Sequence, residues 1–249
     1  MKKSMLTALL IVIALLAVTS AVWGQTTPTT AEAFVNRGLE YAKQGDIDRA
    51  IADFNQAIRL NTNYSYAYVL RGREYFYKGD HDRAIADYNQ TIRLSPNYAT
   101  AYEFRGDAYQ EKKDYDRAIA DYNKAIELDP KNEYTYINRG AMYYYKDEFD
   151  RAIADYTQAI KINPNYAKAY QDRGNVYIEK KDYDRAIADF YQVIRLNPNN
   201  FNGYFSRGFA YSMNGDLDRA IADFEAALRI YPNDVHAKQM LESVRRERR

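Results

Sequence analysis

The hexapeptide DRAIAD is the first stretch whose residue types suggest chemistry. It occupies Asp48–Asp53, and the same six letters begin again at Asp82, Asp116, Asp150, Asp184 and Asp218. Carboxylates beside an arginine are residue types that active sites use. The two carboxylates are five residues apart, however, and they recur six times, whereas an enzyme gathers its special groups in one cleft. The repetition argues against catalysis, so we expect no enzyme and no catalytic residue.

Acidic pairs near the hexapeptide raise the question of a calcium site. They are Asp46-x-Asp48, Asp80-x-Asp82, Asp114-x-Asp116, Asp182-x-Asp184 and Asp216-x-Asp218. A helix–loop–helix calcium loop needs a bidentate Glu at its twelfth position. Counting from Asp46, that position is Ala57. The first Asp of each pair is therefore predicted to cap a helix.

Other metal and cofactor chemistry also lacks its residues. The chain has no cysteine, which excludes disulfides, cysteine-bound zinc and thiol catalysis. His81 and His236 are far apart in the sequence, and neither has companions at metal-ligand spacing. No nucleophile motif and no phosphate-cradling glycine loop occurs. We expect no metal and no cofactor.

The N-terminus is typical of an export signal. Lys2 and Lys3 precede an almost unbroken apolar run, and small residues follow near Gly24. Residues 1–24 are predicted to be a signal peptide, and residues 25–30 a polar flexible linker. The alternative is an uncleaved membrane anchor over residues 5–23. The protein is therefore expected to be exported, either periplasmic or secreted, or else anchored to the membrane.

Net charge excludes one class of partner. The chain carries +1, and removing residues 1–24, whose only charges are Lys2 and Lys3, leaves −1. Such a chain has no broad basic field to steer it onto nucleic acid. We predict no nucleic-acid partner, and membrane contact only through the N-terminal segment.

The sequence is built from an internal repeat of 34 residues. DRAIAD recurs at this step without an insertion or deletion, and a second marker keeps the same step. That marker is Arg-Gly at Arg37-Gly38, Arg71-Gly72, Arg105-Gly106, Arg139-Gly140, Arg173-Gly174 and Arg207-Gly208. A fixed period of this length predicts a stacked array of repeats.

One repeat, residues 99–132, illustrates the elements. Its first half places Tyr102, Gly106 and Tyr109 on one face of a helix. Asp114 caps a second helix, and Pro130 follows its end. A second apolar stripe comprises Ala118, Ile119, Tyr122, Ala125 and Ile126. Each repeat is therefore predicted to be two antiparallel helices, and stacking buries the face that one pair leaves open.

These columns closely resemble the tetratricopeptide repeat family. The first helix repeats an aromatic, a small residue and an aromatic, as in Tyr102, Gly106 and Tyr109. The second repeats Ala, an aromatic and a small residue, as in Ala118, Tyr122 and Ala125, and a proline closes five of the six repeats. The resemblance implies an all-α, right-handed α-solenoid of six antiparallel helix pairs plus a C-terminal capping helix. The expected repeats are residues 31–64, 65–98, 99–132, 133–166, 167–200 and 201–234, followed by a capping helix at 235–249.

Two features depart from the family pattern. Thr62 stands where the first repeat should have its closing proline. Arg37 and its five equivalents stand where the family has an apolar residue, and a half-buried charge without a partner is costly. The last Asp of each hexapeptide reaches a similar height on the facing helix. We therefore predict a ladder of Arg–Asp pairs that starts with Arg37–Asp53.

The residues that do not repeat indicate where function lies. In the family, the first helices line a concave groove that holds extended peptides or partner helices. The resemblance places in that groove Tyr66, Val69, Arg73, Phe76, Glu103, Asp107, Tyr134, Ile137, Tyr144, Gln171, Asn175, Phe205 and Phe209. It implies a non-enzymatic scaffold for a protein or peptide partner, with the oligomeric state open. A glycan- or cell-wall-binding module is the alternative, because a tyrosine-rich groove can stack on sugar rings.

One mode of peptide binding known in the family does not fit this sequence. A clamp for a C-terminal carboxylate uses Lys and Asn on three successive repeats. Asn138 and Lys168 match two of those positions, but Glu103 and Asp107 replace the residues needed one repeat earlier. Because like charges repel, we predict no carboxylate clamp.

Overall fold

The computed structural model of the protein describes residues 28–249. The predicted signal or anchor segment, residues 1–24, and the linker up to residue 27 lie outside the described residues. From residue 28 onwards the chain forms thirteen helices and no strand, so the predicted all-α class is confirmed. None of these helices has the length and apolar character needed to cross a membrane.

The chain divides into two compact units, with the boundary after Ala67. The N-terminal unit contains α2 (Ala31–Lys43), α3 (Ile47–Leu60) and the first residues of α4 (Ser65–Tyr77). Its helices α2 and α3 pack as an antiparallel pair, and Phe54 of α3 is fully buried. Phe54 lies against Gly38, where a Cβ atom would come within 2.6 Å of the ring.

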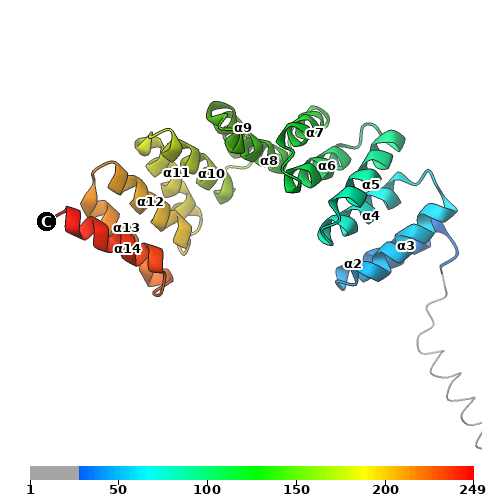
Figure 1. Ribbon diagram of the computed structural model, residues 1–249, viewed down its shortest axis with the longest axis horizontal. Coiled ribbons are helices and arrows are strands. Elements are labelled where there is room, and N and C mark those ends of the chain that lie inside the picture. Colours follow the sequence, from blue (N-terminus) through cyan, green and yellow to red (C-terminus); the bar gives the residue numbers. More distant parts are fainter. Residues whose placement is uncertain (1–27) are drawn as a thin grey trace, which may run out of the picture. The chain divides into compact units, whose positions relative to one another are not determined.

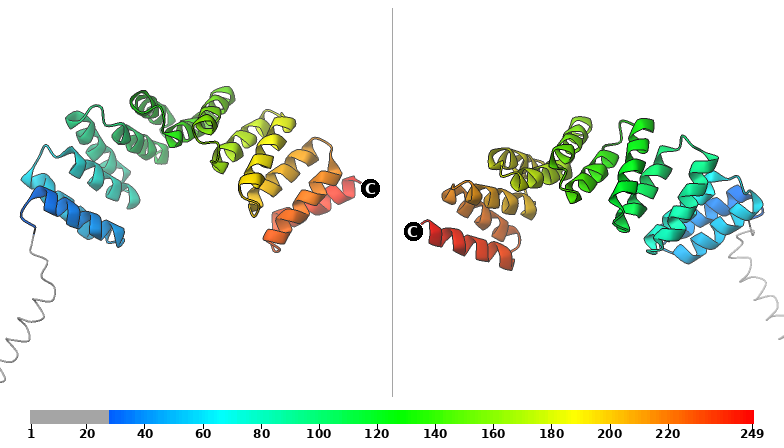
Figure 2. Two further views of the ribbon diagram at one scale, coloured as in Figure 1. Left: turned by 180° about the vertical axis from the view of Figure 1, so that it is seen from behind. Right: turned by 45° about the horizontal axis from the view of Figure 1, so that its top comes forward.

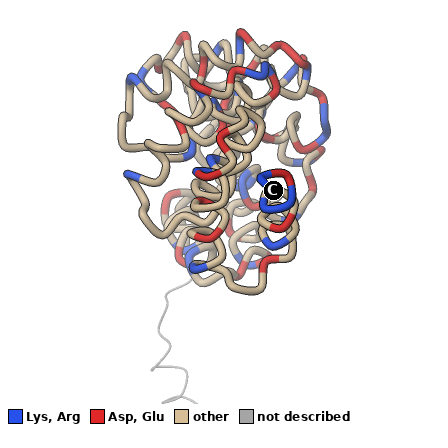
Figure 3. The backbone as a smooth tube through the Cα atoms, turned by 90° about the vertical axis from the view of Figure 1, so that its left-hand side faces the viewer, with Lys and Arg blue, Asp and Glu red and all other residues tan. Residues whose placement is uncertain are grey.

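The C-terminal unit, Tyr68–Arg249, is a solenoid of helical hairpins (Figure 1). After α4 it contains α5 (His81–Leu94), α6 (Ala99–Glu111), α7 (Tyr115–Leu128), α8 (Glu133–Tyr145), α9 (Phe149–Ile162), α10 (Ala167–Glu179), α11 (Tyr183–Leu196), α12 (Phe201–Met213), α13 (Leu217–Ile230) and α14 (Val235–Glu247). Each hairpin packs against the next along the chain, as the two views of Figure 2 also show. Within this unit, Lys and Arg are interspersed with Asp and Glu rather than gathered on one face (Figure 3).

Aspartate side chains begin most of the second helices. The carboxylate of Asp114 accepts a hydrogen bond from the backbone N–H of Arg117 at 3.2 Å. The same cap occurs at Asp46, Asp80, Asp182 and Asp216. These carboxylates occupy backbone donors that would otherwise lack a partner, so the predicted capping role is confirmed. The exception among the second helices is α9, whose N-cap residue is Glu148 and makes no such bond.

The turn inside each hairpin requires a left-handed residue. Gly45, Gly79 and Gly215 adopt φ values of 77°, 77° and 81° at this position. The equivalent positions in the other three repeats hold Lys113, Asp147 and Lys181, each at φ 58°. The residue that follows the left-handed residue satisfies a carbonyl at the C-terminus of the first helix. For example, the Asp114 N–H donates to the carbonyl of Tyr109 at 2.9 Å.

Small residues let the two helices of a pair approach closely. A Cβ atom on Gly106 would lie 2.7 Å from Cε1 of Tyr122, and one on Gly174 would lie 2.6 Å from Cε1 of Phe190. Real Cβ contacts do not reach such distances, so the glycine column is a packing requirement. Ala118 and Tyr122 are fully buried beside it.

The predicted arginine–aspartate ladder is confirmed in all six repeats. Each arginine donates from Nε and Nη2 to the two carboxylate oxygens of its aspartate, over 2.6 to 2.8 Å. The pairs are Arg37–Asp53, Arg71–Asp87, Arg105–Asp121, Arg139–Asp155, Arg173–Asp189 and Arg207–Asp223. This bidentate geometry satisfies a charge that is largely removed from water.

Arg105, Arg139 and Arg173 also tie neighbouring repeats together. The Nη1 of Arg105 donates to Oδ1 of Asn89 at 2.5 Å, and that of Arg139 donates to Oδ1 of Asn123 at 2.6 Å. Arg173 makes the equivalent bond to the hydroxyl of Thr157 at 2.9 Å. The arginine therefore joins its own hairpin to the preceding one.

The other charges of DRAIAD are structural too. In several repeats the first Asp accepts from a lysine of the next repeat, as where Lys112 pairs with Asp82 at 2.6 Å and Lys180 with Asp150 at 2.6 Å. The guanidinium of Arg117 lies 4.4 Å from the ring centre of Tyr109, a cation–π contact that is repeated along the array. The charges of the hexapeptide therefore hold helices together.

Candidate functional site

Three cavities in the C-terminal unit lie beside its first helices, which are α4, α6, α8, α10 and α12. The largest, the aromatic pocket, has a volume of about 310 Å³. It is lined by Tyr144, Asn175, Ile178, Glu179, Phe190, Phe205, Ser206 and Phe209. Its volume is at the low end of the range for small-ligand sites, which suits one or two side chains of a partner.

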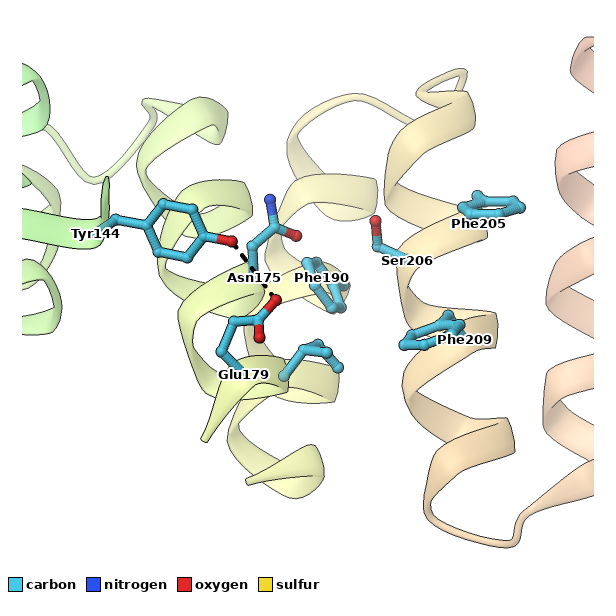
Figure 4. A pocket seen from close by; sticks show the side chains of 8 residues that line it. Tyr144, Asn175, Glu179, Phe190, Phe205, Ser206 and Phe209 are labelled. Carbon is cyan, nitrogen blue, oxygen red and sulfur yellow. Dashed lines mark hydrogen bonds between the residues drawn. The ribbon is translucent and has the colours of Figure 1, made fainter. Parts of the chain in front are cut away.

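The aromatic pocket combines an apolar floor with a polar rim (Figure 4). Phe190 of α11 is fully buried and belongs to the floor, and Phe205 of α12 is held edge-on against Phe224 at 5.7 Å between ring centres. At the rim, the Tyr144 hydroxyl faces the Glu179 carboxylate at 3.5 Å. Burial of its phenol and the nearby Glu179 charge raise the pKa of Tyr144.

The polar pocket lies next to the aromatic pocket and has a volume of about 230 Å³. It is lined by Ala141, Tyr144, Tyr145, Tyr156, Lys168, Asp172 and Asn175, so it shares Tyr144 and Asn175 with its neighbour. The ammonium of Lys168 pairs with the carboxylate of Asp172 at 2.8 Å. Burial raises the pKa of Asp172, and the bond from Lys168 opposes that shift.

Tyr156 brings an unusual hydroxyl to the polar pocket. The residue is only 2% exposed, and its burial raises the pKa of the phenol. Its equivalent one repeat earlier, Tyr122, donates to Oδ1 of Asp107 at 2.7 Å. Ala141 stands at the position equivalent to Asp107, and the Tyr156 hydroxyl has no hydrogen bond to any residue of the described chain.

The small pocket, about 60 Å³ in volume, lies beside α4 and α6. Its lining residues are Arg73, Phe76, Tyr77, Tyr88, Phe104 and Asp107. The guanidinium of Arg73 is paired with Glu74 at 2.9 Å, and Glu74 is buried. The pocket therefore adds a mainly aromatic hollow to the same set of first helices.

Two carboxylates on α6 are the most perturbed acids of the groove. Burial raises the pKa of Glu103 to about 7, assisted by the charge of Asp107 and opposed by a bond from Asn132. Burial also raises the pKa of Asp107 to about 6, although Tyr122 and Asn138 both donate to its Oδ1. Both groups are therefore held partly protonated near neutral pH.

Seven of the predicted groove residues line a cavity. Arg73, Phe76 and Asp107 lie around the small pocket. Tyr144, Asn175, Phe205 and Phe209 lie around the aromatic pocket. Gln171 is next to them, since its Nε2 donates to the Ser206 hydroxyl at 3.0 Å.

The other predicted residues do not join these cavities. Val69 and Ile137 are each 3% exposed and pack in hydrophobic clusters, so they present little surface to a partner. Each belongs to a cluster that includes residues of its own hairpin, and spacing alone did not separate such packed positions from groove positions. Tyr134 is 52% exposed with its ring edge-on to Tyr166. Tyr66 belongs to the N-terminal unit, where it is exposed beside Tyr64.

Some lining residues were missed because they belong to the repeating columns. Tyr88, Tyr156 and Phe190 occupy the repeating aromatic position of the second helix, and that column was not among the predicted groove residues. They are core residues, but one edge of each also lines a cavity. The column holds Phe in three repeats and Tyr in the other three, and this variation was the available signal. Ser206, which precedes the repeated Arg-Gly, carried no signal of its own.

The groups that would form a carboxylate clamp are engaged with acidic residues. Lys168 pairs with Asp172, and Asn138 donates to Asp107 at 3.0 Å. The arrangement supports the argument against such a clamp. Over residues 28–249, no three His, Asp or Glu side chains are gathered as metal ligands would be.

Comparison with known families identifies the repeat. Models described as tetratricopeptide repeat match residues 69–133, residues 155–188, and residues 31–64, 133–166 and 201–234. A further model, described as TPR repeat, matches residues 174–215. Together these matches cover most of the chain. A search of curated proteins found no match.

Several solved structures share the fold. The crystal structure of MamA protein is 30% identical, with a TM-score of 0.63, and covers 67% of this chain and 91% of its own. YrrB, described as a TPR protein with an unusual peptide-binding site, is 22% identical, with a TM-score of 0.65 and coverages of 75% and 96%. The APC/C hetero-tetramer Cut9–Hcn1 is 21% identical with a TM-score of 0.68, and the match covers 92% of this chain but 45% of that chain.

Proposed function

This chain belongs to the tetratricopeptide repeat family, and we propose that it is an exported, non-enzymatic scaffold that holds a peptide segment of another protein against its first helices. Modules of this family commonly mediate protein interactions, and the fold of YrrB accompanies a peptide-binding site in that protein. The proposed partner segment is extended, carries an apolar anchor and is positively charged overall.

The aromatic pocket is the observation that carries the proposal. Three phenylalanines and an isoleucine line an open cavity together with the polar side chains of Tyr144, Asn175, Glu179 and Ser206. Interfaces are anchored by apolar or aromatic side chains that fill such a hollow, while a polar rim excludes water from it. We therefore place the apolar anchor of the partner between α10 and α12.

Charge defines the rest of the segment. Glu103, Asp107, Glu111 and Glu179 lie along α6 and α10, and no lysine or arginine of the described chain pairs with them. The nearby cations Arg73 and Lys168 are already paired with Glu74 and Asp172. A cationic segment would relieve this uncompensated negative charge, and binding should weaken as salt is added.

The export part of the proposal rests on the sequence of residues 1–24. A basic start, an apolar run and small residues before Gly24 are the features of a signal. Sequencing the N-terminus of the protein purified from its host tests it. A mature chain that begins near residue 25 supports export with cleavage, and a membrane fraction that retains Met1 supports anchoring.

A glycan partner is the second candidate, favoured by exposed tyrosine rings. Tyr77, Tyr134 and Tyr145 are all more than half exposed on first helices. Their rings offer exposed surface for stacking on sugars, with one face of Tyr145 already stacked on Tyr115 at 5.4 Å between ring centres. Cell-wall polymer therefore belongs in the same binding experiment as peptides.

The binding experiment compares the wild type with two variants in the aromatic pocket. Full-length protein is presented to a random peptide array and to cell-wall polymer. Phe209→Ala removes an apolar wall, and Asn175→Arg places a cation on an exposed rim position. Both are expected to reduce peptide binding at least tenfold, because hot-spot truncation costs about 2 kcal/mol or more.

Val235→Ala is the matched control, since Val235 is exposed on α14 and lines none of the three pockets. Melting curves establish that each variant is folded. Peptide binding that survives both pocket variants would refute the site. Binding to polymer but not to peptides would favour the glycan candidate.

A further inference from the structure

The polar pocket and the aromatic pocket differ at one repeating position, in addition to their other lining residues. The aromatic column of the second helix holds Tyr156 beside the polar pocket and Phe190 beside the aromatic pocket. These residues occupy the same place in successive repeats, 34 positions apart. The difference between them is a single hydroxyl group, which therefore changes what each pocket can bind.

Packing alone does not account for the Tyr156 hydroxyl. Phe54, Phe190 and Phe224 are fully buried at the same position of other repeats, so the hairpin forms without this oxygen. The Tyr156 ring is buried, but its hydroxyl oxygen is open to the cavity, where solvent or a ligand can reach it. Tyr156 lines a cavity and has no partner in the described chain, so a ligand in that cavity can supply the missing bond.

The charges of the polar pocket favour a neutral occupant. Lys168 and Asp172 already neutralise each other at 2.8 Å. A charged ligand would have to separate this pair and leave a mostly buried carboxylate or an ammonium without its counter-charge. A side-chain amide avoids this cost, because its carbonyl accepts from an ammonium or a hydroxyl and its NH2 donates to a carboxylate.

We propose that the partner segment places an Asn or Gln side chain in the polar pocket, where the Tyr156 hydroxyl recognises its amide, and an apolar side chain in the adjacent aromatic pocket. The inference rests on the proposed function, since it names the sequence of the peptide that the groove holds. Tyr156 acts as a specificity-determining residue, and Phe190 sets the opposite preference next to it.

One extended peptide can reach both pockets. They share Tyr144 and Asn175 as a common wall, so their occupants lie side by side. In an extended chain, residues i and i+2 point to the same side and are separated by about 7 Å. The recognised pattern is therefore an apolar residue and an amide residue two positions apart, within a basic segment.

The test is a selection of peptides by the full-length protein. A random heptapeptide library is selected in parallel against the wild type, Tyr156→Phe and Phe190→Tyr, and binding of the selected peptides is measured by fluorescence anisotropy. Wild-type peptides should carry an apolar residue with Asn or Gln two positions away. Tyr156→Phe should bind these peptides about tenfold more weakly, the cost of one well-formed hydrogen bond, while selecting an apolar residue in place of the amide.

Both substitutions have precedents within the array, because other repeats hold Phe or Tyr at this position, and equal melting temperatures check that folding is retained. Phe190→Tyr should weaken the preference for the apolar residue. If the wild type and Tyr156→Phe select the same peptides, and Phe209→Ala abolishes binding, the inference fails and the proposed function stands. If neither form selects peptides that depend on Phe209, both fail.

Discussion

Arg105 shows at the scale of one residue how a charge is accommodated between helices. Its guanidinium bonds both oxygens of Asp121 in its own hairpin and Asn89 of the preceding one. The side chains of Arg105 and Asp121 are 20% and 7% exposed. Removing one partner of such a pair is costly, whereas replacing both by apolar residues is often neutral.

We predict that Arg105→Leu lowers the free energy of unfolding by about 3 kcal/mol, because Asp121 is left buried without its cation. Arg105→Leu with Asp121→Leu should recover most of this loss. Urea unfolding of both variants provides the measurement. A single variant as stable as the wild type would show that the ladder is dispensable.

The carboxylates of Glu103 and Asp107 predict a dependence of stability on pH. Their pKa values, about 7 and about 6, are higher than in the unfolded chain, so the folded protein binds more protons. The contribution of these two carboxyl groups to the free energy of unfolding is therefore largest at low pH, and it is lost as the pH rises through 6 and 7. Glu111 and Asp129 add negative charge nearby, and Arg73 beside Asp107 is engaged with Glu74.

Asp107→Asn keeps the Oδ1 acceptor for Tyr122 and Asn138 but removes the ionisation. Its melting temperature, relative to the wild type, should rise between pH 5 and pH 8. Glu242→Gln, at an exposed site of α14, is the control and should track the wild type at both values. Parallel pH profiles for Asp107→Asn and the wild type would contradict the assignment.

The hairpin turn carries a backbone strain that differs between repeats, because some repeats have glycine at its left-handed position and others do not. The left-handed conformation costs an ordinary residue roughly 1 to 2 kcal/mol, and it costs glycine little. Three repeats use glycine there, and Lys113, Asp147 and Lys181 occupy it in the others. The repeats with these residues are held in the turn by the packing of the two helices.

Lys113→Gly is predicted to raise the free energy of unfolding by up to about 1 kcal/mol, the relief of strain less the added flexibility of the unfolded chain. The reciprocal change, Gly79→Ala, should lower it by about the same amount. Chemical denaturation of both proteins measures the two effects. Changes of the same sign would argue against strain at this position.

The C-terminal unit as a whole behaves as a linear array, in which each hairpin contacts only its neighbours. Its end is covered by α14, where Leu241 and Val244 are buried against Ile221 and Phe224 of the last pair. In such arrays stability is a sum of local terms, so damage at one end should not spread evenly.

Leu241→Ala should therefore destabilise the end of the array by about 2 to 5 kcal/mol through the cavity it leaves. Hydrogen exchange is expected to accelerate in α12, α13 and α14 and to stay unchanged in α6 and α7. Val235→Ala, at a position that is 60% exposed, should leave both regions unaffected. Uniform acceleration would indicate a fully cooperative unit instead.

The sequence by itself determined the helical pairs, their order and most of what holds them. A period of 34 residues with Gly, Ala and aromatic columns admits few other folds, and the Arg–Asp ladder followed because an unpaired charge between helices is expensive. Helix caps such as Asp114 could also be predicted from the sequence, because the free backbone N–H groups at a helix N-terminus are satisfied by residues close in the chain.

The tertiary structure alone decided which side chains face a cavity. Val69 and Tyr144 were both predicted to lie in the groove, yet Val69 is buried in a hydrophobic cluster and Tyr144 lines two of the pockets, because packing between helices determines which side chains are covered. Tyr156 and Phe190 are core residues that also line a pocket, and the repeating pattern of the sequence does not predict this second role. Whether a tyrosine hydroxyl has a hydrogen-bond partner depends on a residue of another helix. Tyr122 bonds Asp107, but the position equivalent to Asp107 beside Tyr156 is Ala141, whose side chain has no hydrogen-bonding group.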